Sequence, residues 1–267
     1  MRRANLTELA EAAGRAGYGF ITTTSWLYEA APLSGAALRR RIEDCGVKVS
    51  MVDGLTGALP GTPEGMKTLG FEDCARIAHA LGANCLNLVH INGTPQPIGR
   101  LAEAFSKVCR QAASQGLRLV IEFLPGTGIP DLQTALAVVR AGGEKNGAVL
   151  FDSWHFARGG GRLSEIDADA AAWIGAVQLS DRTPDQDLVP YVPMTGRKIP
   201  GRGALPLARM IAPILHAHPA LPVGVEILSD EMEAMPFDEA AVTAAEALRK
   251  VIAEAKTLGP SANDQVQ

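Results

Sequence analysis

Seven short apolar runs alternate with amphipathic segments of helical periodicity along the chain. The runs lie near residues 20, 47, 85, 119, 148, 176 and 223. Strands that alternate with helices form parallel sheets, because each helical crossover returns the chain to the same edge of the sheet. Strands buried on both faces have continuous apolar sequences, as Leu119-Val120-Ile121 does. The alternation therefore predicts an α/β protein built on a parallel sheet.

The number of apolar runs limits which parallel-sheet architecture the chain can form. A (β/α)₈ TIM barrel has eight strands, one more than this chain offers, and the chain opens on a predicted helix at Asn5–Ala13. Two interpretations are a TIM barrel that lacks or opens at its first strand, and a natural start upstream of Met1. An open flavodoxin-like sheet is the competing architecture, but no glycine-rich phosphate turn follows the first run. We expect one barrel domain over residues 1–258 and a flexible tail over residues 259–267.

Composition excludes several classes of function. The 267 residues carry a net charge of −4, which argues against a nucleic-acid partner. No apolar run reaches the length of about 18 residues that a membrane span needs, and no apolar segment after Arg2 and Arg3 forms a signal peptide. The four cysteines lack C-x-x-C spacing and are predicted to be buried or half-buried free thiols. We therefore expect a cytoplasmic protein without a membrane partner.

Four of the apolar runs end in a carboxylate or carboxamide side chain. These residues are Glu122, Asp152, Gln178 and Glu226. Burying a charge without a partner costs several kcal/mol, so such residues contribute little to packing. The chemistry of TIM barrels takes place at the carboxyl ends of their strands. The strand order therefore predicts that these four side chains meet at one face of the barrel.

The four strand-end side chains form a set of oxygen donors. Three carboxylates and one neutral carboxamide give a net charge of −3, and converging carboxylates repel one another unless a cation neutralises them. Oxygen ligands favour Mn²⁺ or Mg²⁺ over tetrahedral zinc. The set predicts one divalent metal ion, with Mn²⁺ favoured and Mg²⁺ or Co²⁺ as alternatives. The other interpretation is that each acid separately caps a helix or pairs with a surface arginine.

Other side chains are predicted close to the same strand ends. His155 lies one helical turn after Asp152 and is assigned an active-site role. Loop arginines can hold a phosphate or carboxylate, although they are also ordinary solvated charges. Trp154 offers either a sugar-stacking wall or core packing, and Asp181 is either a partner of the metal ligands or a loop residue. The residues predicted to contact substrate are His90, Trp154, Arg158, Asp181 and Arg202, with Arg162 and Arg197 as further loop arginines.

Five sequence elements together resemble a known family. They are Ile121-Glu122-Phe123, Phe151-Asp152-Ser153-Trp154-His155-Phe156, Val177-Gln178-Leu179-Ser180-Asp181, Ile199-Pro200-Gly201-Arg202-Gly203 and Val225-Glu226-Ile227. In this order they resemble the sugar phosphate isomerase/epimerase family of xylose isomerase-like TIM barrels, over about residues 1–255. The resemblance implies a (β/α)₈ barrel that begins one strand before Met1. It also implies a divalent metal, often Mn²⁺, held by Glu122, Asp152, Gln178 and Glu226, with His155 touching the substrate.

The resemblance implies a metal-dependent isomerase or epimerase of a keto-sugar or polyol-like substrate. In this hypothesis Glu122 or Glu226 removes the proton next to a metal-polarised carbonyl to form an enediolate, and the other glutamate or His155 returns a proton. Gln178 departs from the histidine that most sugar epimerases of the superfamily have at that position, and it resembles the dehydroshikimate dehydratase branch. A dehydroshikimate- or inosose-type dehydratase is therefore the alternative. The second alternative is a non-catalytic small-molecule-binding barrel, and a homo-oligomer is a further expectation.

Overall fold

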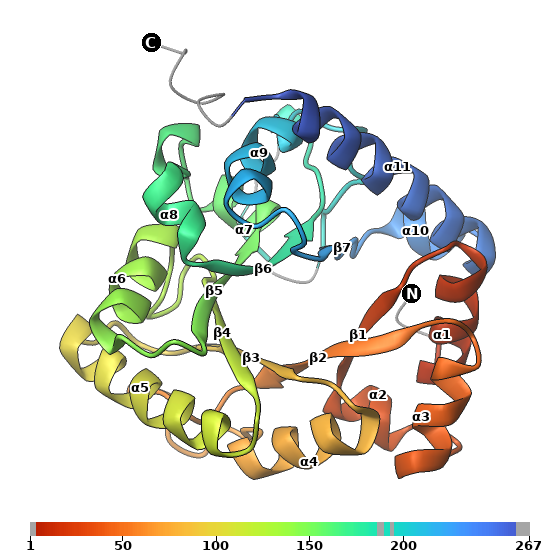
Figure 1. Cartoon of the computed structure of the whole chain (residues 1–267). Helices are drawn as coiled ribbons and strands as arrows, with labels where there is room; N and C mark the ends of the chain where they lie inside the picture. The colour runs from red at the N-terminus through yellow and green to blue at the C-terminus, as the bar shows by residue number, and fades with distance from the viewer. Residues whose placement is uncertain (1–3, 186–189, 193–194, 260–267) are drawn as a thin grey trace.

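Seven parallel strands lie side by side in chain order in the computed structural model, which describes residues 4–185, 190–192 and 195–259 (Figure 1). The parallel sheet predicted from the seven apolar runs is therefore confirmed. The sequential order excludes the flavodoxin-like alternative, in which the strand order reverses. The strands are β1 (Phe20–Thr24), β2 (Lys48–Leu55), β3 (Cys85–Val89), β4 (Arg118–Glu122), β5 (Gly147–Asp152), β6 (Ile174–Leu179) and β7 (Val223–Val225).

The sheet curves into a nearly closed barrel with one seam, between β7 and β1 (Figure 1). Within the described residues, β7 pairs only with β6, and β1 pairs only with β2. The TIM-barrel fold is thus confirmed, as is the expectation that the barrel opens at its first strand.

Helices surround the barrel on the outside (Figure 1). The helix predicted at Asn5–Ala13 is observed, with its first residue at Leu6 and its last at Arg15. Arg158, predicted as a loop arginine, is instead the last residue of α7. The helices are α1 (Leu6–Arg15), α2 (Ser25–Glu29), α3 (Gly35–Glu43), α4 (Phe71–Leu81), α5 (Ile98–Ser114), α6 (Leu132–Gly142), α7 (Ser153–Arg158), α8 (Ala168–Ala172), α9 (Leu207–Ala217), α10 (Asp230–Ala234) and α11 (Phe237–Thr257), with a 3₁₀ turn at Leu163–Glu165.

Local signals fix several helix ends. The Asn5 side chain accepts hydrogen bonds from the backbone N–H groups of Thr7 and Glu8, and the Glu8 carboxylate accepts one from the Asn5 N–H. This reciprocal pair is a capping box at the start of the first helix. At the other end of a helix, Gly82 stops α4 with a φ of 72°, a left-handed conformation that glycine adopts without steric cost.

Side chains alternate between two faces along each strand, and the two faces have different roles. The outward faces of β4 and β5, with Leu119 and Val149, join the large core between sheet and helices. The inward faces begin with an apolar plug and continue, two residues further along each strand, with a polar layer. The plug consists of Met51, Cys85, Val120 and Leu150, and the polar layer of Asp53, Asn87, Glu122 and Asp152. The period of two therefore places the polar side chains at the carboxyl ends of the strands, above the plug.

Two further predictions concern the state of the cysteines and the ability of the helices to span a membrane. Cys74, Cys85 and Cys109 are buried, Cys45 is half-buried, and all four are free thiols, as predicted. Burial raises the pKa of Cys85 to about 11, so this thiol is protonated at neutral pH. Within the described ranges, every helix is too short or too polar to cross a membrane.

Candidate metal centre and active site

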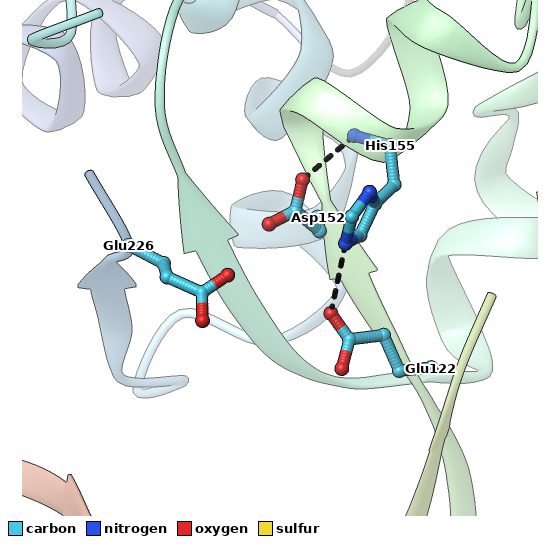
Figure 2. A group of neighbouring side chains, drawn as sticks. All are labelled: Glu122, Asp152, His155 and Glu226. Atoms are coloured by element: carbon cyan, nitrogen blue, oxygen red, sulfur yellow. Dashed lines mark hydrogen bonds and ion pairs between the residues drawn. The ribbon is translucent and has the colours of Figure 1, made fainter. Parts of the chain in front are cut away.

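The structure brings four of the predicted residues together at the carboxyl ends of the strands. Glu122 ends β4, Asp152 ends β5, His155 lies on α7 and Glu226 directly follows β7. One possible ligand atom from each residue lies within 4.8 Å of the other three. Figure 2 shows Glu226 facing the other three side chains from the opposite side of the cluster. This arrangement is a possible metal-binding cluster.

Gln178 lies beside this cluster on β6, where its backbone is in register with Asp152. The side chain is buried, and its Oε1 has no hydrogen-bond partner among the described residues. Leaving a buried acceptor unsatisfied costs about 1–3 kcal/mol. An unpartnered carboxamide oxygen next to three carboxylates fits the set of hard oxygen ligands that a divalent cation prefers.

Asp152 is fully buried, and both of its oxygens have partners. Oδ1 accepts hydrogen bonds from the backbone N–H groups of Trp154 and His155, each at 2.8 Å, and so caps α7. Oδ2 lies 2.6 Å from Nη1 of Arg197. Burial raises the pKa of Asp152, but Arg197 and His155 lower it more, so the net pKa is below its ordinary value. The group is therefore a carboxylate at neutral pH.

Arg197 enters the cluster from the long loop between β6 and α9. The sequence analysis treated it as one of several loop arginines at the rim, but only 1% of its side chain is exposed. Its Nη2 lies 2.9 Å from Oε2 of Glu226, and its Nη1 also donates to Oγ of Ser180 at 3.3 Å. The interpretation of Arg197 as a rim residue is wrong. Its guanidinium supplies part of the positive charge that the converging acids require.

Glu122 is held by an amide that the sequence analysis missed. The side-chain N–H₂ of Asn87 donates to Oε2 of Glu122 at 2.7 Å and to Oδ1 of Asp53 at 2.8 Å. Burial raises the pKa of Asp53 to about 8, and the charges of Glu122 and Glu226 add to the increase. Asn87 thus orients Glu122, and Asp53 adds a mostly neutral carboxylic acid to the polar layer at pH 7.

His155 has three neighbours that compete for its two ring nitrogens. Nδ1 lies 2.7 Å from the hydroxyl oxygen of Tyr191, while Nε2 lies 3.5 Å from Oε1 of Glu122 and 3.2 Å from Nη2 of Arg197. Burial lowers the pKa of His155, but Asp152 and Glu122 raise it more, so the net pKa is raised. Protonated His155 donates Nε2–H toward Glu122 and Nδ1–H to Tyr191, and its Nε2 then cannot accept from Arg197.

Glu226 is the most accessible carboxylate of the cluster. Its side chain is 28% exposed, whereas that of Glu122 is 7% exposed and that of Asp152 is buried. Burial raises the pKa of Glu226 to about 7 against the opposing effect of Arg197, and the charges of Glu122 and Asp152 add to the increase. A carboxyl group with a pKa close to neutral can both accept and return a proton.

Four of the residues predicted to contact substrate lie outside the cluster. Trp154 is buried, and the guanidinium carbons of Arg197 and Arg158 lie 5.1 Å and 5.6 Å from its ring centroid. Arg202 is half-exposed and pairs with Glu231 at 2.9 Å. His90 is buried against the loops at residues 93 and 128, where a Cβ atom would lie 2.0 Å and 2.6 Å from its ring.

Asp181 is also outside the cluster, and it organises the loop that carries Arg197. Its backbone pairs with that of Lys198, and its buried carboxylate accepts hydrogen bonds from four backbone N–H groups. The four donors are Arg182 at 2.8 Å, Leu205 at 2.9 Å, and Gly201 and Gly203 at 3.0 Å each. The Pro-Gly-x-Gly element is therefore folded around Asp181.

Replacement of Asp181 by alanine is expected to lower the free energy of unfolding by about 3 kcal/mol, because several buried N–H groups lose their acceptor. Urea denaturation measures this loss, and hydrogen exchange of Gly201 and Gly203 should accelerate together with it. Asp185→Ala, at an exposed position of the same loop, is the control and should change the free energy by less than about 0.5 kcal/mol. Equal effects of the two substitutions would contradict the anchoring role.

Comparisons of sequence agree with the family resemblance. A family model described as "Xylose isomerase-like TIM barrel" matches residues 8–253. A protein of Streptomyces coelicolor, named as a putative hydroxypyruvate isomerase, is 29% identical over 199 residues, which are 66% of this chain and 67% of that protein.

Solved structures share the fold at low sequence identity. A xylose isomerase-like TIM barrel/4-hydroxyphenylpyruvate dioxygenase fusion protein matches 99% of this chain with a TM-score of 0.82 and 18% identity, and the match spans 43% of the fusion protein. The IOLI protein with a bound zinc atom has a TM-score of 0.80 and 17% identity over 96% of this chain and 95% of its own. A D-psicose 3-epimerase has a TM-score of 0.68 and 16% identity over 93% of both chains.

Proposed function

We propose that this chain, which belongs to the xylose isomerase-like TIM barrel family, is a divalent-metal-dependent isomerase or epimerase. The observation that carries the proposal is the pair of glutamates, Glu122 and Glu226, which face each other beside a set of oxygen ligands (Figure 2). The substrate class is a small molecule with a carbonyl next to a hydroxyl-bearing carbon, such as a keto-sugar or a hydroxyketo acid. The hydroxypyruvate named for the relative is a compound of this kind.

Glu122, Asp152, Gln178 and Glu226 are the residues that we assign to the metal ion, with Mn²⁺ as the favoured ion. The unpartnered Oε1 of Gln178 and the oxygen-rich donor set support this assignment. When bound, the ion supplies Lewis-acid polarisation of the substrate carbonyl and stabilises the negative charge of the enediolate.

Glu226 is the residue that we assign to removal of the proton next to the carbonyl. Its exposure at the barrel mouth suits a carboxylate that takes a proton from a bound substrate. Glu122 faces it from the other side and is oriented by Asn87. We assign the return of the proton to Glu122 or, through its contact with Glu122, to His155.

Dehydration is the second candidate function. The same enediolate loses the hydroxyl group of the next carbon as water if an acid protonates that hydroxyl group. His155 is favoured for this role by its raised pKa and its position in the cluster. The two functions share the first proton transfer and differ in the product, so product analysis separates them.

The test is a substrate screen in deuterium oxide, followed by proton NMR. Protein loaded with Mn²⁺ is incubated with hydroxypyruvate, ketohexoses, inososes and dehydroshikimate. Isomerase activity predicts a metal-dependent product with deuterium at the carbon next to the carbonyl, whereas loss of water indicates the dehydratase. Absence of metal in elemental analysis, together with absence of exchange for every compound, would support the non-catalytic binding barrel instead.

Replacing Tyr191 by phenylalanine is expected to lower kcat about tenfold and to leave KM nearly unchanged. The substitution keeps the ring, whose centroid lies 5.2 Å from that of Trp154, and removes the hydroxyl group that holds Nδ1 of His155. Steady-state kinetics measure the effect. Because the hydroxyl acts through the imidazole, the same substitution should have no further effect in a His155→Gln background. Tyr28→Phe, on α2, is the control.

A further inference from the structure

We propose that Arg197 and the divalent ion compete for Asp152 and Glu226. In the metal-free protein the guanidinium holds the two carboxylates together, and it leaves them when the ion binds. This inference rests on the metal site of the proposed function and concerns how the Arg197 guanidinium regulates access of the metal ion to that site.

The first argument is that the two cations need the same oxygen of Asp152. Oδ1 is occupied by the backbone N–H groups of Trp154 and His155. Oδ2 is therefore the oxygen left for an ion, and Arg197 already lies 2.6 Å from it. A metal–oxygen bond of about 2.0–2.2 Å to Oδ2 would bring the ion close to the guanidinium nitrogen.

The second argument is that Arg197 spans two residues of the proposed ligand set. Its Nη2 lies 2.9 Å from Oε2 of Glu226, on the other side of the cluster from Asp152. A planar guanidinium can bind two separate carboxylates at once through its several N–H donors. The same guanidinium therefore occupies one oxygen from each of two of the four residues that we assign to the metal.

The third argument concerns charge and burial. Only 1% of the Arg197 side chain is exposed, so its charge depends on these carboxylates for compensation. A divalent ion placed among Glu122, Asp152 and Glu226 would neutralise the same negative charge and would repel the guanidinium at short range. Simultaneous full contact of both cations with Asp152 and Glu226 is therefore unfavourable.

The guanidinium already makes one contact that does not involve the carboxylates. Its carbon lies 5.1 Å from the centroid of the Trp154 ring, within the range of a cation–π contact. The Nε of Arg197 has no partner among the described residues, so the present arrangement leaves one donor unsatisfied. The backbone is fixed by the hydrogen bond from the Arg197 N–H to the Leu228 carbonyl, so the side chain alone has to move.

The experiment is titration of chelator-treated protein with Mn²⁺ at pH 8, followed by calorimetry. Arg197→Met is expected to bind Mn²⁺ at least tenfold more tightly than the wild type, which corresponds to about 1.4 kcal/mol. The control is Arg162→Met, which makes the same change of charge at a residue that pairs with Glu165 and is 79% exposed. Its Kd should stay within about twofold of the wild-type value. Unchanged or weaker binding by Arg197→Met would overturn the competition.

Thermal unfolding gives a second measurement of the same effect. Metal-free Arg197→Met should melt at a lower temperature than the metal-free wild type, and saturating Mn²⁺ should raise its Tm by more than it raises that of the wild type. If this variant does not fold, Arg197→Lys replaces it, because one ammonium group cannot span both carboxylates and should give an intermediate gain in affinity. Equal Mn²⁺ affinity in Arg197→Lys and the wild type would then overturn the competition.

The outcomes separate the two proposals. Mn²⁺ binding by the wild type without a gain in Arg197→Met overturns the competition and leaves the metal site standing. Absence of Mn²⁺ binding in every variant overturns the metal site, and the competition and the proposed function fail with it. Binding of Mn²⁺ by Arg197→Met but not by the wild type would support the competition, because the wild-type guanidinium would then exclude the ion completely.

Discussion

Glu226→Gln is expected to lower kcat about 10³-fold while the barrel remains folded. Glutamine has nearly the same size as glutamate but cannot accept the proton of the substrate, and general base catalysis contributes about 10²–10⁴-fold to a rate. The kinetics are measured on the substrate that the NMR screen identifies, and the exchange of the substrate proton with deuterium should fall by a similar factor. Circular dichroism and thermal unfolding check that the fold is retained.

Glu246→Gln is the matched control for this experiment, because Glu246 is an exposed glutamate on α11, outside the barrel mouth. Its kcat should stay within about twofold of the wild-type value. Retention of activity in Glu226→Gln would remove Glu226 from the mechanism and would leave Glu122 and His155 as the proton carriers.

Asp152→Ala is expected to lower the free energy of unfolding of the metal-free protein by about 3–5 kcal/mol. The substitution leaves the guanidinium of Arg197 buried without the carboxylate that lies 2.6 Å away, and it also removes the cap of α7. Removing one partner of a buried ion pair has a large cost because the remaining charge loses compensation, and Glu226, 2.9 Å from Nη2, replaces Asp152 only in part. Urea denaturation with chelator present measures the change.

Asp131→Ala separates the contribution of the ion pair from that of the cap. Asp131 caps α6 by accepting a hydrogen bond from the Thr134 N–H at 2.8 Å, and it is half-buried. Loss of a helix cap alone should cost about 1 kcal/mol. If the two substitutions destabilise the protein equally, the ion pair between Asp152 and Arg197 contributes nothing to stability.

The barrel could be predicted because its strands have strong and repeated signals. Leu119-Val120-Ile121 and Ala148–Phe151 are continuous apolar runs, and each is followed by an acid at the strand end. Since parallel strands share one direction, the positions of Glu122 and Asp152 on their strands were enough to expect them at the same face. Their meeting in one cluster follows from the topology alone.

Asp53 and Asn87 could have been found with the same pattern. Each follows an inward-facing apolar residue, Met51 or Cys85, by two positions, as Glu122 follows Val120. The sequence analysis missed Asp53 because it assigned no polar residue to the end of the run near residue 47. It missed Asn87 because a single polar residue inside an apolar run was not read as part of the inward face.

The position of Arg197 could not be predicted. It lies in a loop between β6 and α9 that has no periodicity, and the sequence contains Arg158, Arg162 and Arg202 in similar glycine-rich surroundings. The distinction between these arginines arises from tertiary contacts. The anchor at Asp181 folds the loop back over the strand ends, and only the structure shows that this brings Arg197 into the acid cluster.

Because the barrel has a seam between β7 and β1, the residues of the candidate site are held by different numbers of strand pairings. Glu122 and Asp152 stand on β4 and β5, which are hydrogen-bonded to neighbouring strands on both sides. Glu226 follows the three-residue strand β7, which pairs with β6 alone within the described part of the chain, and the Glu226 N–H donates to the Leu179 carbonyl at 3.1 Å. The sheet therefore holds Glu122 and Asp152 from both sides and Glu226 from one side. We therefore expect the backbone of Glu226, the group that we assign to proton transfer, to shift more easily than that of Glu122 or Asp152.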